Sequence, residues 1–378
     1  MIIKASTGAA VLLLTQLMTL SSTEIAKRQP IANGISFYVG TYTRGESKGI
    51  YRYQLQPDGK LKSFGLAAES ENPSFLAKSL DGKYLLAANE NRDDAGGGGT
   101  ITSFEINGEA LSLIDKKPSG GASPCFVTID KSGYVFAANY SSGNVGLLRL
   151  GSSGMLEGPL HVLQHEGEGS HARQKGPHAH SVWFEPKGNT IISVDFGTNE
   201  LWFSTLDKGN EKLVPTAPYK LAMAPEAGPR HMAFHPKGSW AYVVNELSST
   251  ITQINKNNVG HYQIASSIST LPTGYGETSS CADIHISDDG KFLYASNRGH
   301  NSIAIYQVNS SNGSLTLVGH EGVRGDWPRN FTLSPGGDYL LVANQKSNNI
   351  ISFKRDKKSG KLEFVSEIEA PSPVCLLF

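Results

Sequence analysis

Short stretches in which every second residue is apolar recur from about residue 35 to the end of the chain, separated by glycine, proline, asparagine and serine. Alternation with a period of two, in segments rich in β-branched and aromatic residues, is typical of β-strands. One pattern returns six times: a strand that begins near a proline or small residue, a tight turn, and a second strand that ends at Asn or Asp. A third and usually a fourth strand follow. The turn glycines lie about fifty residues apart, at Gly82, Gly133, Gly188, Gly238, Gly290 and Gly337.

Four antiparallel strands repeated at this period predict the blades of a β-propeller. The two ends of the chain complete the count. The stretches "ISFYVGTYT" and "GIYRYQLQ" match a second and a third strand, and "SPVCLLF" at the C-terminus supplies the missing first strand. We therefore predict an all-β fold over residues 31–378, a seven-bladed β-propeller closed by pairing of the N- and C-terminal strands. No stretch typical of a linker divides it into two domains.

Each blade of the predicted ring presents two side chains to one mouth of the central channel. A single hairpin joins the first and second strands, so the first strand starts and the second ends on the same side. These positions hold Ser74, Cys125, His180, Arg230, Ala282, Arg329 and Val374 on the first strands, and Tyr42, Glu90, Tyr140, Phe196, Glu246, Arg298 and Gln345 on the second. Structural positions of a pseudo-symmetric ring should resemble one another, and these do not. His180, Arg230, Glu246 and Arg298 come from three consecutive blades, so we predict that they form one charged cluster.

Arginine, glutamate and histidine clustered in a partly dry channel suit acid–base and anion chemistry. Arginines bind a carboxylate or phosphate through paired hydrogen bonds, or stabilise an oxyanion that forms on a carbonyl group. A glutamate or histidine beside them transfers a proton to or from water or substrate. The structural alternative is an ion-pair network that ties neighbouring blades together. We interpret the cluster as catalytic and add a substrate-binding set, which comprises His178, Asp283, Arg329, Gln345 and Glu90. For Asp283, a buried pair with His285 is the alternative.

The composition narrows the possible partners. The chain carries 34 Lys and Arg against 34 Asp and Glu, with no basic cluster, which argues against nucleic acid. Cys125, Cys281 and Cys375 have neither metal-ligand nor redox spacing and are expected to be small apolar fillers without a disulfide. His178 and His180 form an H-x-H pair that could hold a metal. No carboxylate completes the set at a fixed spacing, so we expect no metal and no other cofactor. The zero net charge and closed sheet edges indicate a monomer.

Residues 1–30 differ from the rest of the chain. Lys4 precedes the apolar run "AAVLLLTQLMTL", which has the length of the hydrophobic region of a secretory signal and is too short to span a bilayer comfortably. We predict a signal peptide, and hence a periplasmic or secreted protein that is not membrane-bound after its removal. A disordered N-terminal tail is the alternative for this segment.

Several motifs resemble those of a known family. The stretches "YVGTYT", "PHAHSVWFEP", "GPRHMAFHPKG", "ADIHISDDGKFLYASNRG" and "WPRNFTLSPGG" are similar to the bacterial propeller lactonase family, from about residue 35 to the C-terminus. That family includes the propeller type of 6-phosphogluconolactonase and resembles fungal carboxymuconate lactonizing enzymes. The resemblance implies four active residues, which are His180 in "HAHS", Arg230 in "GPRH", Glu246 in "VVNE" and Arg298 in "SNRG".

The resemblance implies metal-independent hydrolysis of a small-molecule sugar lactone. In such a mechanism Arg230 and Arg298 would bind the anion and stabilise the oxyanion, and Glu246 or His180 would act as general base and general acid. A 6-phosphogluconolactonase acts in the cytosol, whereas the predicted export of this chain favours an unphosphorylated lactone. Two alternatives are a non-catalytic extracytoplasmic propeller that binds a ligand at the same mouth, and a muconate-type cycloisomerase. Fold alone does not choose among them.

Overall fold

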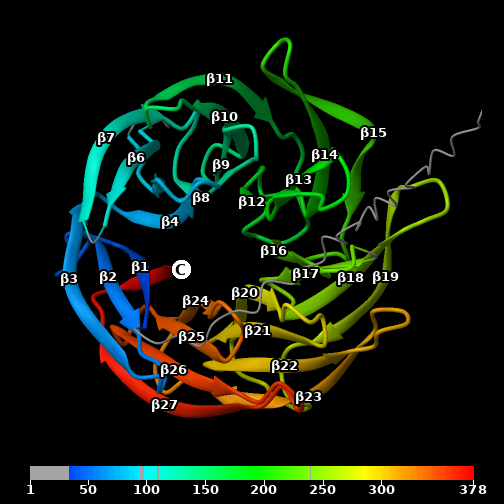
Figure 1. Ribbon diagram of the computed structural model, residues 1–378. Helices are drawn as coiled ribbons and strands as arrows, with labels where there is room; N and C mark the ends of the chain where they lie inside the picture. Colours follow the sequence, from blue (N-terminus) through cyan, green and yellow to red (C-terminus); the bar gives the residue numbers. More distant parts are fainter. Residues whose placement is uncertain (1–33, 94–97, 109, 239) are drawn as a thin grey trace, which may run out of the picture.

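The computed structural model describes residues 34–93, 98–108, 110–238 and 240–378, so the predicted signal peptide lies outside the described residues. The described residues form 28 β-strands and no helix. No helix among them is therefore long and apolar enough to cross a membrane. The strands make seven four-stranded antiparallel sheets, which stand in a ring around a common axis (Figure 1). The predicted seven-bladed β-propeller is confirmed.

Each sheet is one blade, and its strands run outward from the axis in chain order, except that the innermost strand of blade 1 comes from the C-terminus. The strands, from the inside outward, are β28 (Pro373–Leu377), β1 (Ile35–Thr41), β2 (Gly49–Leu55) and β3 (Leu61–Glu69) in blade 1; β4 (Pro73–Lys78), β5 (Tyr84–Asn89), β6 (Thr100–Asn107) and β7 (Ala110–Pro118) in blade 2; β8 (Pro124–Ile129), β9 (Tyr134–Asn139), β10 (Asn144–Leu150) and β11 (Leu156–Gln164) in blade 3; β12 (Ala179–Phe184), β13 (Ile191–Asp195), β14 (Glu200–Asp207) and β15 (Lys212–Ala222) in blade 4; β16 (Pro229–Phe234), β17 (Trp240–Asn245), β18 (Thr250–Lys256) and β19 (Tyr262–Ser269) in blade 5; β20 (Ser280–Ile286), β21 (Phe292–Arg298), β22 (Ser302–Val308) and β23 (Leu315–Gly322) in blade 6; and β24 (Pro328–Leu333), β25 (Tyr339–Asn344), β26 (Asn349–Arg355) and β27 (Leu362–Glu369) in blade 7.

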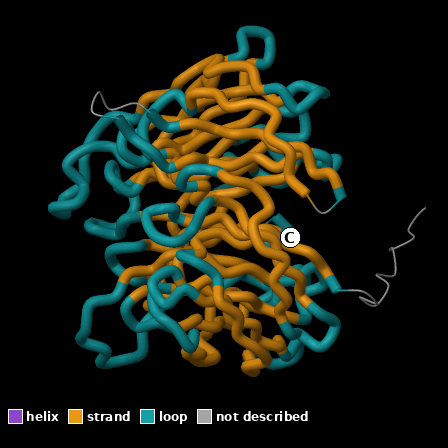
Figure 2. Tube along the Cα trace, turned by 90° about the vertical axis from the view of Figure 1, so that its left-hand side faces the viewer, coloured by secondary structure: helices purple, strands orange, loops and turns teal. Residues whose placement is uncertain are grey.

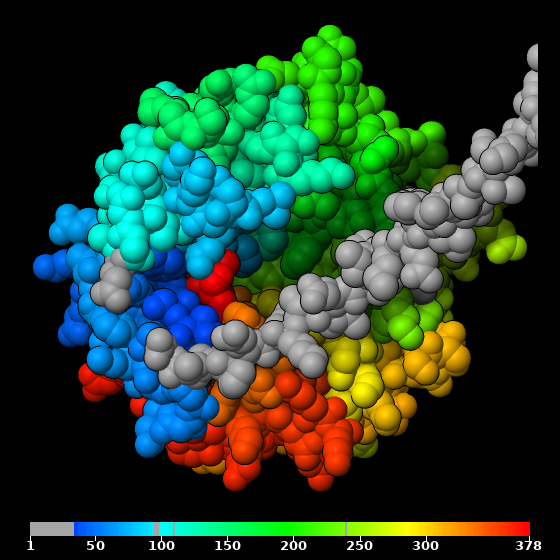
Figure 3. Space-filling model, viewed as in Figure 1, coloured from blue at the N-terminus to red at the C-terminus, as the bar shows by residue number. Residues whose placement is uncertain are grey.

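The ring closes through blade 1, as the sequence predicts. Strand β28 pairs antiparallel with β1, with Tyr38 opposite Leu377 and Gly40 opposite Cys375. In the space-filling view the C-terminal end lies against the first strands near the middle of the face (Figure 3). Seen from the side, the strands form the body of the ring and most loops lie at its two faces (Figure 2). Closure pairs the inner edge of β1, which would otherwise be exposed.

Apolar packing between the blades supports the inner strands. Within the described residues, seven apolar clusters fill the ring, one between each pair of neighbouring blades. Between blades 5 and 6, Tyr242 and Val244 pack against Ile284, Leu293 and Tyr306, each at most 1% exposed. Burial of one side chain of this size contributes about 1.5–3 kcal/mol. The side chains at the mouth of the channel are therefore carried on tightly packed strands.

Gly40 in β1 lies at the seam, where β1 pairs with the C-terminal strand β28, and its replacement tests how tightly the ring is closed. A Cβ atom there would lie 2.4 Å from the carbonyl oxygen of Pro73 and 3.3 Å from Cβ of Cys375. We therefore expect Gly40→Ala to lower the free energy of unfolding by about 1–3 kcal/mol, measured by urea denaturation. Gly45→Ala is the matched control, because a Cβ atom at Gly45 meets nothing within 4 Å. Equal stabilities of the two variants would contradict the packing described at the seam.

Candidate active site

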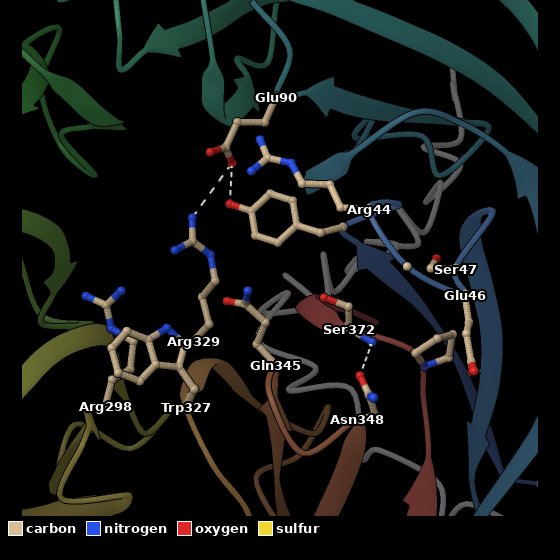
Figure 4. Close-up of a pocket in the computed structure, with 13 residues that line it drawn as sticks. Arg44, Glu46, Ser47, Glu90, Arg298, Trp327, Arg329, Gln345, Asn348 and Ser372 are labelled. Carbon is tan, nitrogen blue, oxygen red and sulfur yellow. Dashed lines mark hydrogen bonds and ion pairs between the residues drawn. The ribbon is translucent and has the colours of Figure 1, made fainter.

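A pocket of about 650 Å³ opens at the mouth of the channel where blades 1, 2, 6 and 7 meet (Figure 4). Its walls contain Tyr42, Arg44, Gly45, Glu46, Ser47, Glu90, Arg298, Trp327, Arg329, Gln345, Asn348, Pro371 and Ser372. Four of the predicted site residues, Glu90, Arg298, Arg329 and Gln345, therefore face one space. The pocket combines positive and negative side chains with two aromatic rings, which suits a small polar ligand.

A β-bulge at the start of every inner strand determines which side chains turn toward the axis. The pairing register shifts between Pro73 and Phe75 in β4, between Pro229 and His231 in β16, and at the matching place in the other blades. The residues that the pairing skips are Ser74, Cys125, His180, Arg230, Ala282 with Asp283, Arg329 and Val374. These are the predicted first-strand positions. Bulges re-aim side chains and are frequent next to active sites.

Three arginines surround the carboxylate of Glu246. Its Oε2 atom lies 2.8 Å from Nη2 of Arg298 and 3.3 Å from Nε of Arg230, and its Oε1 atom lies 2.8 Å from Nη2 of Arg173. Burial raises the pKa of Glu246, but the three guanidinium groups more than offset it and lower the pKa to about 2. Glu246 is therefore an anion at neutral pH with both oxygens engaged, which disfavours the predicted alternative of Glu246 as general base.

Arg230 and Arg298 connect this cluster to the channel wall and the pocket. Arg230 is 2% exposed and donates from Nη1 to the carbonyl oxygen of Ala282. Burial, together with the positive charges of Arg329 and Arg298, lowers the pKa of Arg230 to about 10, so it stays charged at neutral pH. Arg298 donates from Nη2 to the carbonyl oxygen of Cys281 at 2.7 Å and also lines the pocket. Arg298 is thus the member of the predicted catalytic cluster that faces the pocket.

His180 and His178 flank Tyr140 on the channel wall outside the pocket lining. His180 is 4% exposed, its Nδ1 lies 3.7 Å from Sγ of Cys125, and its ring meets Tyr140 edge-on with centroids 5.6 Å apart. Burial, reinforced by the charge of Arg230, holds the pKa of His180 well below its ordinary value, so it is neutral at pH 7. His178 stacks on Tyr140 at 4.5 Å and donates from Nδ1 to the Tyr140 carbonyl oxygen at 2.9 Å.

The carboxylate of Asp283 is buried and contacts three polar side chains. Its Oδ1 atom lies 2.8 Å from Nδ1 of His231, and its Oδ2 atom accepts from Nδ2 of Asn330 at 2.5 Å and lies 3.1 Å from Nε2 of His285. The carboxyl group is 4% exposed. Burial raises its pKa, but His285 and His231 outweigh this effect and leave the pKa well below its usual range. These contacts favour the buried pair over a substrate-binding role.

A second group of charged residues forms the opposite side of the pocket. Glu90 Oε2 accepts a hydrogen bond from the Tyr42 hydroxyl at 2.7 Å and lies 3.7 Å from Nη2 of Arg329. The Arg329 guanidinium group lies over the Tyr42 ring, 5.2 Å from its centroid. Burial raises the pKa of Tyr42, so its hydroxyl remains a donor. In Figure 4 the side chain of Gln345 lies between those of Arg329 and Ser372.

Sequence reasoning missed three contributors. Arg173 lies in the long loop between β11 and β12, half exposed, with its guanidinium group over Phe196 at 4.7 Å. Arg44 lies in the loop after β1, the second strand of blade 1, Trp327 directly precedes the inner strand β24, and both line the pocket. Trp327 directly precedes the repeat proline, like Asn72 and Ser123, but the residue types at this place share no chemistry that would mark it as part of a site. The only available signal is a long loop that carries an arginine beside the predicted mouth.

Cys125, Cys281 and Cys375 are all free and buried, which confirms the prediction that they form no disulfide. Among residues 34–93, 98–108, 110–238 and 240–378, no group of three or more His, Cys, Asp or Glu is placed to hold a metal ion.

Comparison with known proteins identifies the family. Residues 36–378 match the family described as "Lactonase, 7-bladed beta-propeller". A 6-phosphogluconolactonase of Bacillus subtilis is 36% identical over 347 residues, which cover 90% of this chain and 97% of that protein. A 6-phosphogluconolactonase of Formosa agariphila is 34% identical, with 86% and 94% covered. The solved structure of a Pseudomonas aeruginosa periplasmic gluconolactonase has a TM-score of 0.86 at 31% identity, over 90% of this chain and 98% of that chain. The chain therefore belongs to the seven-bladed β-propeller lactonase family, and it is an enzyme of the lactonase class.

The lowered pKa of Glu246 predicts a specific pH dependence of stability. Its folded-state pKa of about 2 lies below the ordinary value of 4.5. The ionised carboxylate therefore stabilises the fold above pH 4.5, and this contribution, of about 3 kcal/mol, is lost as the pH falls toward 2. We expect Glu246→Gln to unfold more easily than the unaltered chain at pH 7, with the gap in unfolding free energy narrowing toward pH 2.

Urea denaturation at several pH values measures this gap. Glu363→Gln, at an exposed position in β27, is the control and should keep the pH dependence of the unaltered chain. A gap between Glu246→Gln and the unaltered chain that stays constant from pH 7 to pH 2 would contradict the assigned environment of Glu246.

Proposed function

We propose that this chain hydrolyses a sugar lactone in the pocket at the mouth of the channel. The observation that carries the proposal is that Arg298 and Arg329, from neighbouring blades 6 and 7, face the same pocket as the carboxylate of Glu90. Ester hydrolysis needs a donor for the negative charge that forms on the carbonyl oxygen and a group that accepts a proton from water. Both kinds of group line this pocket. Relatives named as 6-phosphogluconolactonases, and a solved gluconolactonase, support the substrate class.

Within the predicted catalytic cluster, we assign the contact with substrate to Arg298. Its guanidinium group would donate to the oxyanion of the tetrahedral intermediate, an interaction that typically contributes about 3 kcal/mol per donor. Glu246 and Arg230 act through Arg298, because Glu246 holds both guanidinium groups in place. His180, neutral beside Arg230, fills the channel wall without adding a further positive charge.

We propose further that the substrate is an unphosphorylated lactone and that the chain acts outside the cytoplasm as a monomer. The pocket walls carry Arg44, Arg298 and Arg329 against Glu46 and Glu90, a balance of three positive and two negative charges. One net positive charge suits an oxyanion and falls short of a phosphate dianion. The signal-like segment at residues 1–30 and the periplasmic relative from Pseudomonas aeruginosa support the location.

Turnover of a small panel of lactones tests the proposed function. The purified chain is assayed with gluconolactone, 6-phosphogluconolactone and a muconolactone-type compound, and spontaneous ring opening is subtracted. We expect turnover of gluconolactone with kcat/KM above that for the phosphorylated sugar, because the pocket carries a single excess positive charge. Preference for 6-phosphogluconolactone would overturn the unphosphorylated assignment, and turnover of no lactone would overturn the proposed function.

Replacement of Arg298 tests its role in charge stabilisation. Arg298→Gln keeps a hydrogen-bond donor but removes the charge, so we expect kcat to fall about 10²–10³-fold. Arg324→Gln is the control, because Arg324 is half exposed and lies 4.0 Å from Glu321 on the surface, and it should retain full activity. A kcat for Arg298→Gln within about threefold of the unaltered chain would contradict the assignment.

A further inference from the structure

Blades 2 and 5 each carry an Asn-Glu dipeptide at the end of the second strand, but different side chains surround the two glutamates. Glu90 follows Asn89 at the end of β5, and Glu246 follows Asn245 at the end of β17. Their backbone N–H groups make equivalent hydrogen bonds, from Glu90 to the carbonyl oxygen of Asn72 at 2.9 Å and from Glu246 to that of Gly228 at 2.6 Å. The backbone therefore presents both carboxylates to the channel mouth in the same manner, and any difference in chemistry comes from their neighbours.

The neighbours leave only one of the two carboxylates available to the pocket. Glu246 contacts three guanidinium groups through both oxygens and does not line the pocket. Glu90 lines the pocket, and its Oε2 atom contacts the Tyr42 hydroxyl and Arg329. No described residue donates a hydrogen bond to its Oε1 atom. Figure 4 shows the Glu90 carboxylate at the end of the pocket wall, turned toward Arg329.

We infer that Glu90 is the general base of the reaction, and that Glu246 is a positioning residue. This inference rests on the proposed function. Tyr42 fixes the rotamer of Glu90 through Oε2, which leaves Oε1 free to accept a proton. Because the backbone of Glu90 is anchored to Asn72, the carboxylate is held before substrate binds, and such preorganisation is what general acid–base groups need.

Hydrolysis proceeds through a tetrahedral intermediate. Water forms a bond to the lactone carbonyl carbon while Oε1 of Glu90 takes one of its protons, and the carbonyl π electrons move to oxygen. Arg298 and Arg329 face this oxyanion from the pocket wall. On collapse, the bond between the carbonyl carbon and the ring oxygen breaks, and the proton on Glu90 passes to the ring oxygen. The product is an open-chain hydroxy acid, which releases its carboxylic proton to solvent, and Glu90 returns to its starting state.

The charged and titratable groups around Glu90 define what its pH profile reports. Tyr42 and Arg44 approach from blade 1, Arg329 from blade 7 and Cys125 from blade 3 (Figure 4). Burial, to which the charge of Glu90 adds, raises the pKa of the Cys125 thiol, so it stays protonated. Burial likewise raises the pKa of Tyr42. Neither Cys125 nor Tyr42 therefore ionises in the acid range, so a loss of activity at low pH cannot be assigned to either group.

The test compares Glu90→Gln with the unaltered chain and three further variants, by kcat, KM and the pH profile of kcat/KM on gluconolactone. We expect Glu90→Gln to lower kcat about 10²–10⁴-fold with little change in KM, and to lose the acid limb of the profile. Glu90→Asp, which keeps a shorter carboxylate, should retain the acid limb at a reduced kcat. Glu246→Gln should also lower kcat but keep the acid limb. Glu105→Gln, at an exposed position of β6 in the same blade, controls for the loss of one negative charge.

The outcomes distinguish failure of Glu90 as general base from failure of the proposed lactonase function. Turnover by the unaltered chain with kcat of Glu90→Gln reduced less than about threefold would overturn Glu90 as base and leave the lactonase assignment standing. Loss of the acid limb in Glu246→Gln, with its retention in Glu90→Gln, would transfer the role to Glu246. Should Glu90→Gln not fold, an unchanged kcat in Glu90→Asp would overturn the inference, because a carboxylate moved back by one methylene cannot transfer the proton as efficiently. Turnover of no lactone by the unaltered chain removes both proposals.

Discussion

Closure of the ring by β28 is the constraint on which the site depends. Glu90 belongs to blade 2, Tyr42 to blade 1 and Arg329 to blade 7, so the three side chains meet only because the C-terminal strand joins the last blade to the first. The same closure completes the apolar cluster between blades 7 and 1, which includes Leu376 of β28. The pocket is therefore a property of the closed ring, and no single repeat contains it.

The buried ion network around Glu246 is difficult to explain by stability alone. Removing charges from water costs several kcal/mol per ion, and replacement of buried ion pairs by apolar side chains is often neutral or stabilising. The blades of this ring are already held by an apolar cluster at every interface. Three arginines on one carboxylate, with Arg298 extending into the pocket, are better explained by the need to fix a guanidinium group where negative charge develops. A role in function is therefore favoured over an ion-pair network that only ties neighbouring blades together.

The ring and its inward-facing positions could be predicted from sequence because the repeat is long and regular. Six turn glycines set the register, and the skipped residue of each inner strand proved to be the one that follows the repeat proline or its substitute. The pocket itself could not be predicted in this way. Arg44 and Trp327 line it from loops, and Arg173 reaches Glu246 from a loop whose length has no counterpart in the repeat. The choice between Glu246 and His180 as general base was open from the sequence for a related reason, because the pKa of Glu246 depends on how many guanidinium groups surround it in space.

The pseudo-symmetry of the ring allows two chemically identical groups at equivalent positions to take different roles. The repeat places a glutamate after asparagine in blades 2 and 5 with the same backbone hydrogen bond, so the protein chain supplies two equivalent carboxylates at one mouth. Surrounding one with three arginines turns it into a fixed anion, whereas pairing the other with a tyrosine hydroxyl and a more distant arginine leaves an oxygen free. Two carboxylates in one site take different roles when their environments differ in this way. On a ring of similar blades, this difference arises from substitutions at neighbouring inward positions, Arg230 and Arg298, together with one long loop that brings Arg173 to Glu246.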